Sequence, residues 1–82
     1  MLTAKVLITL KKSILDPQGN TIKRALNSMG YPEVADVRQG KMMEVKLNDM
    51  AREKAVAIVD EMCQKLLANP VIEEYSFELV ED

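Results

Sequence analysis

Hydrophobic and polar residues alternate with a period of two near both ends of the chain. In the first ten positions the apolar residues that share one face are Leu2, Ala4, Val6, Ile8 and Leu10. Because successive side chains of a strand point to opposite faces, this pattern predicts a β-strand with one buried face. Tyr75, Phe77 and Leu79 repeat the alternation and predict a last strand.

The pattern becomes helical after Pro17. Asp16 is a suitable N-cap, Pro17 has the φ that a first helical residue needs, and Gly30 can end the helix with a positive φ. The apolar positions that recur every three or four residues, and predict a helix of about three turns, are Ile22, Ala25, Leu26 and Met29.

A second helical pattern begins near residue 50. Asn48 or Asp49 would accept hydrogen bonds from its first free amides. The Asn69-Pro70 pair would end it, because proline disfavours the α region for the residue before it. The apolar positions of this helix are Ala51, Ala55, Ile58, Val59, Met62 and Leu66.

Residues 33–48 predict two strands that meet at Gln39-Gly40, where glycine would supply the positive φ of a tight turn. Met43, Val45 and Leu47 share one face of the second of these strands. The element order is then β-α-β-β-α-β. Two right-handed βαβ units joined by a hairpin give a ferredoxin-like α+β sandwich, with one antiparallel sheet and both helices on the same face.

The opposite face of that sheet is predicted to be uncovered. It would carry apolar Leu7, Met42 and Val80 among charged and polar neighbours. Such a mixed surface suits a protein partner better than open water, although single exposed apolar side chains are common.

Length and charge narrow the class of protein. The 82 residues form a single domain (1–82), and a chain this short buries only about 60–65% of its unfolded surface, so association would stabilise it. A net charge of −2 without a basic stripe argues against nucleic-acid binding. With one cysteine, no signal-peptide pattern and no apolar run of about 20 residues, we expect a cytoplasmic protein without a membrane segment.

The composition also limits the chemistry of the chain. It has no histidine, so histidine-activated nucleophiles and histidine metal sites are excluded, and we expect no catalytic, cofactor-binding or metal-binding residues. Cys63 is expected to be a small buried hydrophobic residue rather than a reactive thiol. The adjacent carboxylates of Asp60-Glu61 and Glu73-Glu74 point apart and are expected to be solvated. The methionines expected in the core are Met29, Met43 and Met62.

Gly19 lies in the first turn of the first predicted helix, where a glycine costs about 0.5–1 kcal/mol against alanine. It is understandable if another group approaches the backbone closely, and a neutral sequence accident is the alternative. A phosphate site is disfavoured, because DPQGN lacks the glycines of a P-loop and Asp16 would itself occupy the free amides.

Three segments of the chain carry a family likeness: LDPQG at residues 15–19, VRQGK at 37–41 and CQKLLANPVIEEY at 63–75. In this order and with these gaps they resemble the PurS family, the small subunits of bacterial and archaeal phosphoribosylformylglycinamidine synthase. The resemblance implies a non-catalytic subunit that joins a PurL synthetase to a PurQ glutaminase and helps to shape a protected route for ammonia. It also implies a homodimer, which could associate into a dimer of dimers, and a complex that uses ATP and Mg while this chain binds no cofactor.

Six residues are predicted to contact these partners: Asp16, Gln18, Gly19, Arg38, Lys41 and Asn69. Most were selected because local structure explains them least. For Arg38 and Lys41 the alternative is a solvated hairpin rim, and for Asn69 it is helix termination.

Other functions remain open from the sequence alone. A ferredoxin-like fold also serves as a small-molecule-binding regulatory module, which is the main alternative. RNA binding is less favoured, because the predicted central strands lack the aromatic residues on which bases would stack. A small enzyme acting through carboxylates or lysine is less favoured too, because no pair of titratable groups has a spacing that would perturb its pKa values.

Overall fold

Three antiparallel strands and two helices make up residues 1–81, the part of the chain that this computed structural model describes. The α+β class and the antiparallel sheet expected from the sequence are confirmed. In chain order the elements are β1 (Leu2–Leu10), α1 (Pro17–Ser28), β2 (Gly40–Leu47), α2 (Arg52–Met62), the π-helical segment η1 (Cys63–Leu67) and β3 (Glu73–Glu81).

β1 is the central strand of the sheet, whose order is β2-β1-β3. In the antiparallel register Val6 lies opposite Met43 on β2 and Phe77 on β3. These three side chains share the face toward α2, because residues opposite each other on neighbouring strands point the same way. The predicted assignment of residues to the two faces of these strands is therefore confirmed.

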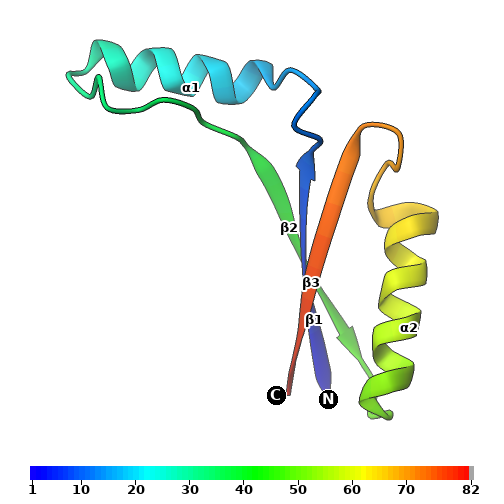
Figure 1. Ribbon diagram of the computed structural model, residues 1–82. Helices are drawn as coiled ribbons and strands as arrows, with labels where there is room; N and C mark the ends of the chain where they lie inside the picture. The colour runs from blue at the N-terminus through cyan, green and yellow to red at the C-terminus, as the bar shows by residue number, and fades with distance from the viewer. Residues whose placement is uncertain (82) are drawn as a thin grey trace.

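α2 covers one face of the sheet (Figure 1) and buries Ala55 and Val59 in the core. The largest side chains that are almost completely buried are Ile8 and Val6 from β1, Val59 from α2 and Cys63 from the start of η1. The stripe on α2 follows the expected spacing at Ala55, Ile58, Val59 and Met62. Two residues expected on it are exposed instead: Ala51, which precedes the helix, and Leu66 in η1, at 82%. The wider π-helical turn places Leu66 outside this stripe.

Residues 33–39 do not form the fourth strand that the sequence predicted, and the chain does not reverse at Gln39-Gly40. These residues run beside α1 and lead directly into β2 (Figure 1). Gly40 is required for close packing and not for a turn, since an added Cβ would lie 2.5 Å from the carbonyl oxygen of Ile8. Within residues 1–81 the positive φ belongs to Gly30, at 101°.

The sequence predicted two helices packed on one face of the sheet, and only α2 packs there (Figure 1). α1 instead extends beyond the end of the sheet. We call residues 12–39 the arm. No buried apolar core residue of the described chain comes from the arm, and Met29, which was expected in the core, is 71% exposed. The Cα radius of gyration is 16.2 Å, against about 12 Å for a compact domain of this length.

The helix ends are only partly as expected. Asp16 caps α1, Pro17 begins it, and Gly30 follows it in a Schellman arrangement, in which the Gly30 and Tyr31 amides donate to the carbonyls of Asn27 and Leu26. The cap predicted for α2 at Asn48 or Asp49 is wrong. Ala51 is the N-cap and provides no side-chain hydrogen bond, while the Asp49 carboxylate pairs with the N-terminal ammonium group of Met1.

Candidate functional site

Five of the six predicted contact residues lie at one end of the sheet, where β1 ends and β2 and β3 begin (Figure 1). Each of the five takes part there in a hydrogen bond, an ion pair or a close backbone contact. Loop 11–16, the last residues of the arm and loop 68–72 meet there. We call this group of interactions the sheet-end cluster, and its residues are Asp16, Gly19, Arg38, Lys41, Asn69 and Glu73.

Asp16 joins the two segments of the arm. Its Oδ1 accepts a hydrogen bond from the Gly19 amide at 3.0 Å, as the sequence predicted for an N-cap. Its Oδ2 accepts a second one from the Gln39 amide at 2.7 Å, 23 residues further along the chain. These two bonds, with help from the nearby Arg38 guanidinium, hold the pKa of the Asp16 carboxyl below its ordinary value, against a smaller opposing effect of burial.

Gly19 has the close backbone neighbour that its position suggested, and this neighbour belongs to the same chain. A Cβ at Gly19 would lie 2.1 Å from the carbonyl oxygen of Val37 and 2.9 Å from Oδ2 of Asp16. Real Cβ atoms do not approach oxygen so closely, so any side chain here would push the two segments of the arm apart. The geometry therefore explains Gly19 without an external partner.

Arg38 connects the end of the arm to its beginning. Its Nη1 donates to the carbonyl of Ile14 at 2.7 Å and its Nη2 to the carbonyl of Lys12 at 2.8 Å. Its Nε lies 3.9 Å from the Asp36 carboxylate, and an ion pair this long and exposed contributes little to stability. The guanidinium thus uses its planar fork on two backbone carbonyls of loop 11–16, which differs from the solvated rim considered for this residue.

Lys41 and Asn69 are linked through Glu73. The Glu73 carboxylate lies 3.5 Å from Nζ of Lys41 and accepts a hydrogen bond of 2.7 Å from the Asn69 amide. The Asn69 side chain accepts from the Val71 amide, so it shapes the turn between η1 and β3, in agreement with the alternative of helix termination. Glu73 was expected to be solvated, but its side chain is only 16% exposed.

Gln18 is the sixth predicted contact residue. Its side chain is exposed and borders a hollow of about 310 Å³ at this end of the sheet. The other residues that line the hollow are Leu10, Asp16, Gln39, Gly40, Lys41 and Glu73. Sequence reasoning missed Gln39, Val37 and Glu73, because their roles depend on distant segments.

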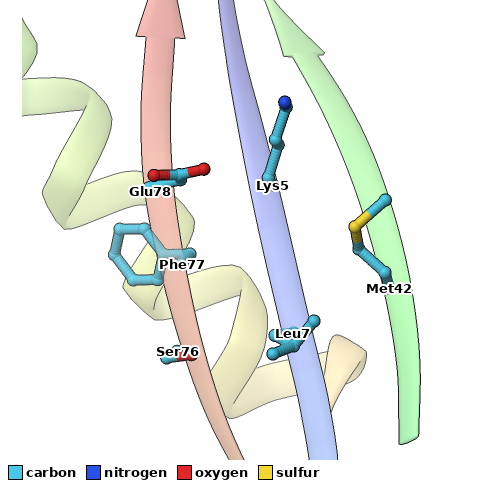
Figure 2. A pocket seen from close by; sticks show the side chains of 6 residues that line it. All are labelled: Lys5, Leu7, Met42, Ser76, Phe77 and Glu78. Atoms are coloured by element: carbon cyan, nitrogen blue, oxygen red, sulfur yellow. The ribbon is translucent and has the colours of Figure 1, made fainter.

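The uncovered face of the sheet forms a second surface. Lys5 and Leu7 on β1 stand between Met42 on β2 and Ser76 and Glu78 on β3 (Figure 2), around a shallow hollow of about 260 Å³. Leu7 and Met42 are 51% and 58% exposed. Lys5 lies opposite Glu44 on one side and Glu78 on the other, so opposite charges face one another across the strands. The expected mixture of apolar and charged residues on this face is confirmed.

The titratable groups on the covered face are held by the fold. Cys63 is completely buried, and burial raises the pKa of its thiol, so it is the small hydrophobic residue expected from the sequence. The Tyr75 hydroxyl donates to Asp60 at 2.6 Å, and this bond raises the pKa of Tyr75. Gln64 donates to the same carboxylate. Asp60 therefore connects α2, η1 and β3 and is not the solvated charge that was expected.

The fold shifts the pKa values of Asp16 and Cys63 in opposite directions. The pKa of Asp16 is lowered and that of Cys63 is raised, which keeps the first ionised and the second protonated near neutral pH. Over residues 1–81, no group of three or more acidic or cysteine side chains is placed to hold a metal ion. Neither described helix is long and apolar enough to cross a membrane.

Comparison with known proteins assigns the chain to a family. A family model for PurS, described as phosphoribosylformylglycinamidine (FGAM) synthase, matches residues 3–81. The chain is similar to the PurS subunit of phosphoribosylformylglycinamidine synthase from Bacillus subtilis, with 52% identity over 81 residues that cover 99% of this chain and 95% of that protein. The PurS subunit from Methanocaldococcus jannaschii is 46% identical over 79 residues, or 96% of this chain and 95% of that protein.

Solved structures agree with the sequence comparisons. The crystal structure of Methanocaldococcus jannaschii PurS superposes with a TM-score of 0.88 at 44% identity and covers 100% of this chain and 99% of that chain. A chain in the structure of PurLQS from Thermotoga maritima gives a TM-score of 0.84 at 32% identity, covering 98% of this chain and 99% of that one. The ferredoxin-like α+β fold is confirmed by these likenesses. The chain therefore belongs to the PurS family, the PurS subunits of phosphoribosylformylglycinamidine synthase.

Proposed function

We propose that this chain is the non-catalytic PurS subunit that joins a PurL synthetase and a PurQ glutaminase into one phosphoribosylformylglycinamidine synthase. The observation that carries this proposal is the likeness over nearly the whole of both chains to a chain in the PurLQS structure from Thermotoga maritima. The reaction of the complex would convert formylglycinamide ribonucleotide to formylglycinamidine ribonucleotide with ATP and ammonia from glutamine, as a step of purine biosynthesis.

A bridging role without catalysis is supported by the chemistry of the chain. It has no histidine. The carboxylates of Asp16 and Asp60 each accept two hydrogen bonds from other groups of the chain. General acid–base work needs a group that can exchange its proton near neutral pH, and these carboxylates are committed as acceptors. The glutaminase and ATP chemistry would then belong to PurQ and PurL, with this chain helping to enclose the route of ammonia.

ATP and Mg²⁺ would be bound by the other subunits. Mg²⁺ sites in nucleotide-dependent enzymes use carboxylates together with substrate phosphates. This proposal is supported by the described residues 1–81, which hold no group of three or more acidic or cysteine side chains placed for a metal ion.

The shape of the chain supports association with itself as well as with PurL and PurQ. We infer a homodimer, because the extended arm and the uncovered sheet face leave apolar side chains exposed that a compact monomer would bury. Pairing of dimers would use further surface of the same kind. A subunit of a purine-biosynthetic complex would act in the cytoplasm.

The experiment is a glutamine-dependent synthase assay of PurL and PurQ from the same organism, with and without this chain, together with size-exclusion chromatography and light scattering of the mixture. We expect activity and a large species to require all three proteins. Ammonium chloride in place of glutamine is the control, because it should support PurL with less dependence on the bridge. Full glutamine-dependent activity of PurL and PurQ alone would contradict the proposed function.

A further inference from the structure

The arm is structurally separable from the core. The buried apolar residues belong to the three strands, to α2 and η1, and to Ala68. Residues 12–39 leave the sheet at the end of β1 and return at the start of β2 (Figure 1). In the described residues 1–81, apolar packing in the core therefore does not hold α1 in place.

Polar contacts at the base of the arm hold its two segments together where they leave and rejoin the sheet. Asp16 ties the start of α1 to the Gln39 amide through its two carboxylate oxygens. Arg38 ties the returning segment to the carbonyls of Ile14 and Lys12. Gly19 lets the backbone at Val37 lie directly against α1. These contacts cross-link the two segments of the arm within a few residues of the sheet.

Large apolar side chains lie on the arm at increasing distance along the sequence from this base. Ile22 is 39% exposed, Met29 is 71% exposed and Tyr31 is 51% exposed. A helix rises 1.5 Å per residue, so a small change of angle at Asp16 displaces Met29 by several ångströms. Contacts that these side chains make in an assembly must then depend on the angle at the base.

We propose that Asp16 and Arg38 are positioning residues, which hold the arm in the direction that assembly of the synthase requires and do not themselves touch a partner. This inference rests on the proposed function for the meaning of assembly. It replaces the initial expectation of direct contact for these two residues. An arm held in advance loses less conformational entropy when it binds than one that swings freely.

The variants are Asp16→Asn and Arg38→Lys, with Glu33→Gln as the matched control. The amide nitrogen of asparagine cannot accept a hydrogen bond, so one of the two bonds at residue 16 is lost. Lysine keeps the charge of Arg38 but has no planar fork for two carbonyls. Glu33 is an exposed acidic residue of the same arm, and its change removes the same charge as Asp16→Asn.

The first measurement is amide hydrogen exchange on the isolated chain. In Asp16→Asn we expect the Gly19 and Gln39 amides to exchange about tenfold faster, or more, because one bond is lost and the other keeps only an uncharged acceptor. In Arg38→Lys we expect the Gln39 amide to exchange faster, because the returning segment loses its two bonds to loop 11–16. The amides of Val6 and Val59 in the core should be unchanged. Gly19→Ala is a second test, since it displaces the Val37 carbonyl without changing any charge. Unchanged exchange at Gly19 and Gln39 would overturn the proposal.

The second measurement is a titration of each variant into PurL and PurQ in the glutamine-dependent assay. A positioning role predicts that the concentration for half-maximal rate rises about tenfold while the rate at saturation stays at the wild-type level. An unchanged half-saturation concentration, or a lower rate at saturation, would overturn the proposal. Because exchange is measured on the chain alone, failure of wild-type chain to support activity would count against the proposed function and not against the holding of the arm.

Discussion

At the scale of single residues, Asp16 shows how one side chain serves a local and a long-range purpose. Its cap of α1 involves a residue three positions away, and this kind of contact follows from the sequence rules for helix starts. Its bond to the Gln39 amide joins residues 23 positions apart. No local pattern predicts the second bond, and yet this bond gives the arm its shape.

The lowered pKa of Asp16 predicts an acid-dependent loosening of the arm. Because the folded pKa lies below the ordinary value of 3.8, the stabilisation is complete above about pH 4 and is lost as the pH falls through the folded pKa. Amide chemical shifts of Gly19 and Gln39, followed from pH 6 to pH 2, should report the change. Asp16→Asn should lack this transition, and an identical transition in that variant would assign it to another group.

At the scale of elements, β1 shows how one strand supports two different surfaces. Its even-numbered positions from Leu2 to Ile8 are buried against α2, and Lys5 and Leu7 face outward. As the central strand it hydrogen-bonds to β2 and β3 along its length. The alternating pattern therefore indicated both the core and the uncovered face before any tertiary contact was known.

Neighbouring positions of β1 should respond very differently to truncation. Ile8 is 1% exposed, so Ile8→Ala should lower the free energy of unfolding by about 3 kcal/mol through lost burial and a residual cavity. Leu7 is 51% exposed, and Leu7→Ala should change it by no more than about 0.5 kcal/mol in the dissociated chain. Urea unfolding at low protein concentration measures both. Similar losses at the two positions would contradict the assignment of faces.

At the scale of the whole molecule, the chain is long and thin, with principal extents of 49 × 28 × 14 Å. Its core lies between one layer of sheet and the α2–η1 helix, and the arm adds surface without adding buried apolar core residues. Such a shape stabilises a single chain poorly and offers a large area to other subunits. It fits a protein that works inside an assembly.

The thermal midpoint of the protein should therefore depend on its concentration. If folded chains associate and unfolded chains do not, a tenfold increase in concentration should raise Tm by roughly a few degrees, by mass action. Differential scanning calorimetry at protein concentrations from about 10 to about 500 µM measures this dependence. Light scattering at the same concentrations reports the size of the folded species. A Tm that stays constant over this range would indicate a chain that is stable as a monomer.

The sequence indicated where most of the candidate site lies, but it did not indicate what each residue contacts there. The six predicted residues were chosen because local rules explained most of them poorly, and five of them take part in contacts at one end of the sheet. Gly19 and Arg38 turned out to serve the chain itself. Their partners, the Val37 carbonyl and loop 11–16, come from segments whose proximity no period or spacing encodes.

The sequence by itself determined β1, β2 and β3, the faces they bury, both helices and the family likeness, because these depend on residues that are close along the chain or on short sequence motifs. Tertiary structure alone decided that residues 33–39 join α1 instead of the sheet, and that α1 points away from the core. The physical reason is the choice of acceptor for the backbone amide of Gln39, which could bond either to a neighbouring strand or to the Asp16 side chain. Gln39 donates to the Asp16 carboxylate, a charged acceptor that a neighbouring strand could not match.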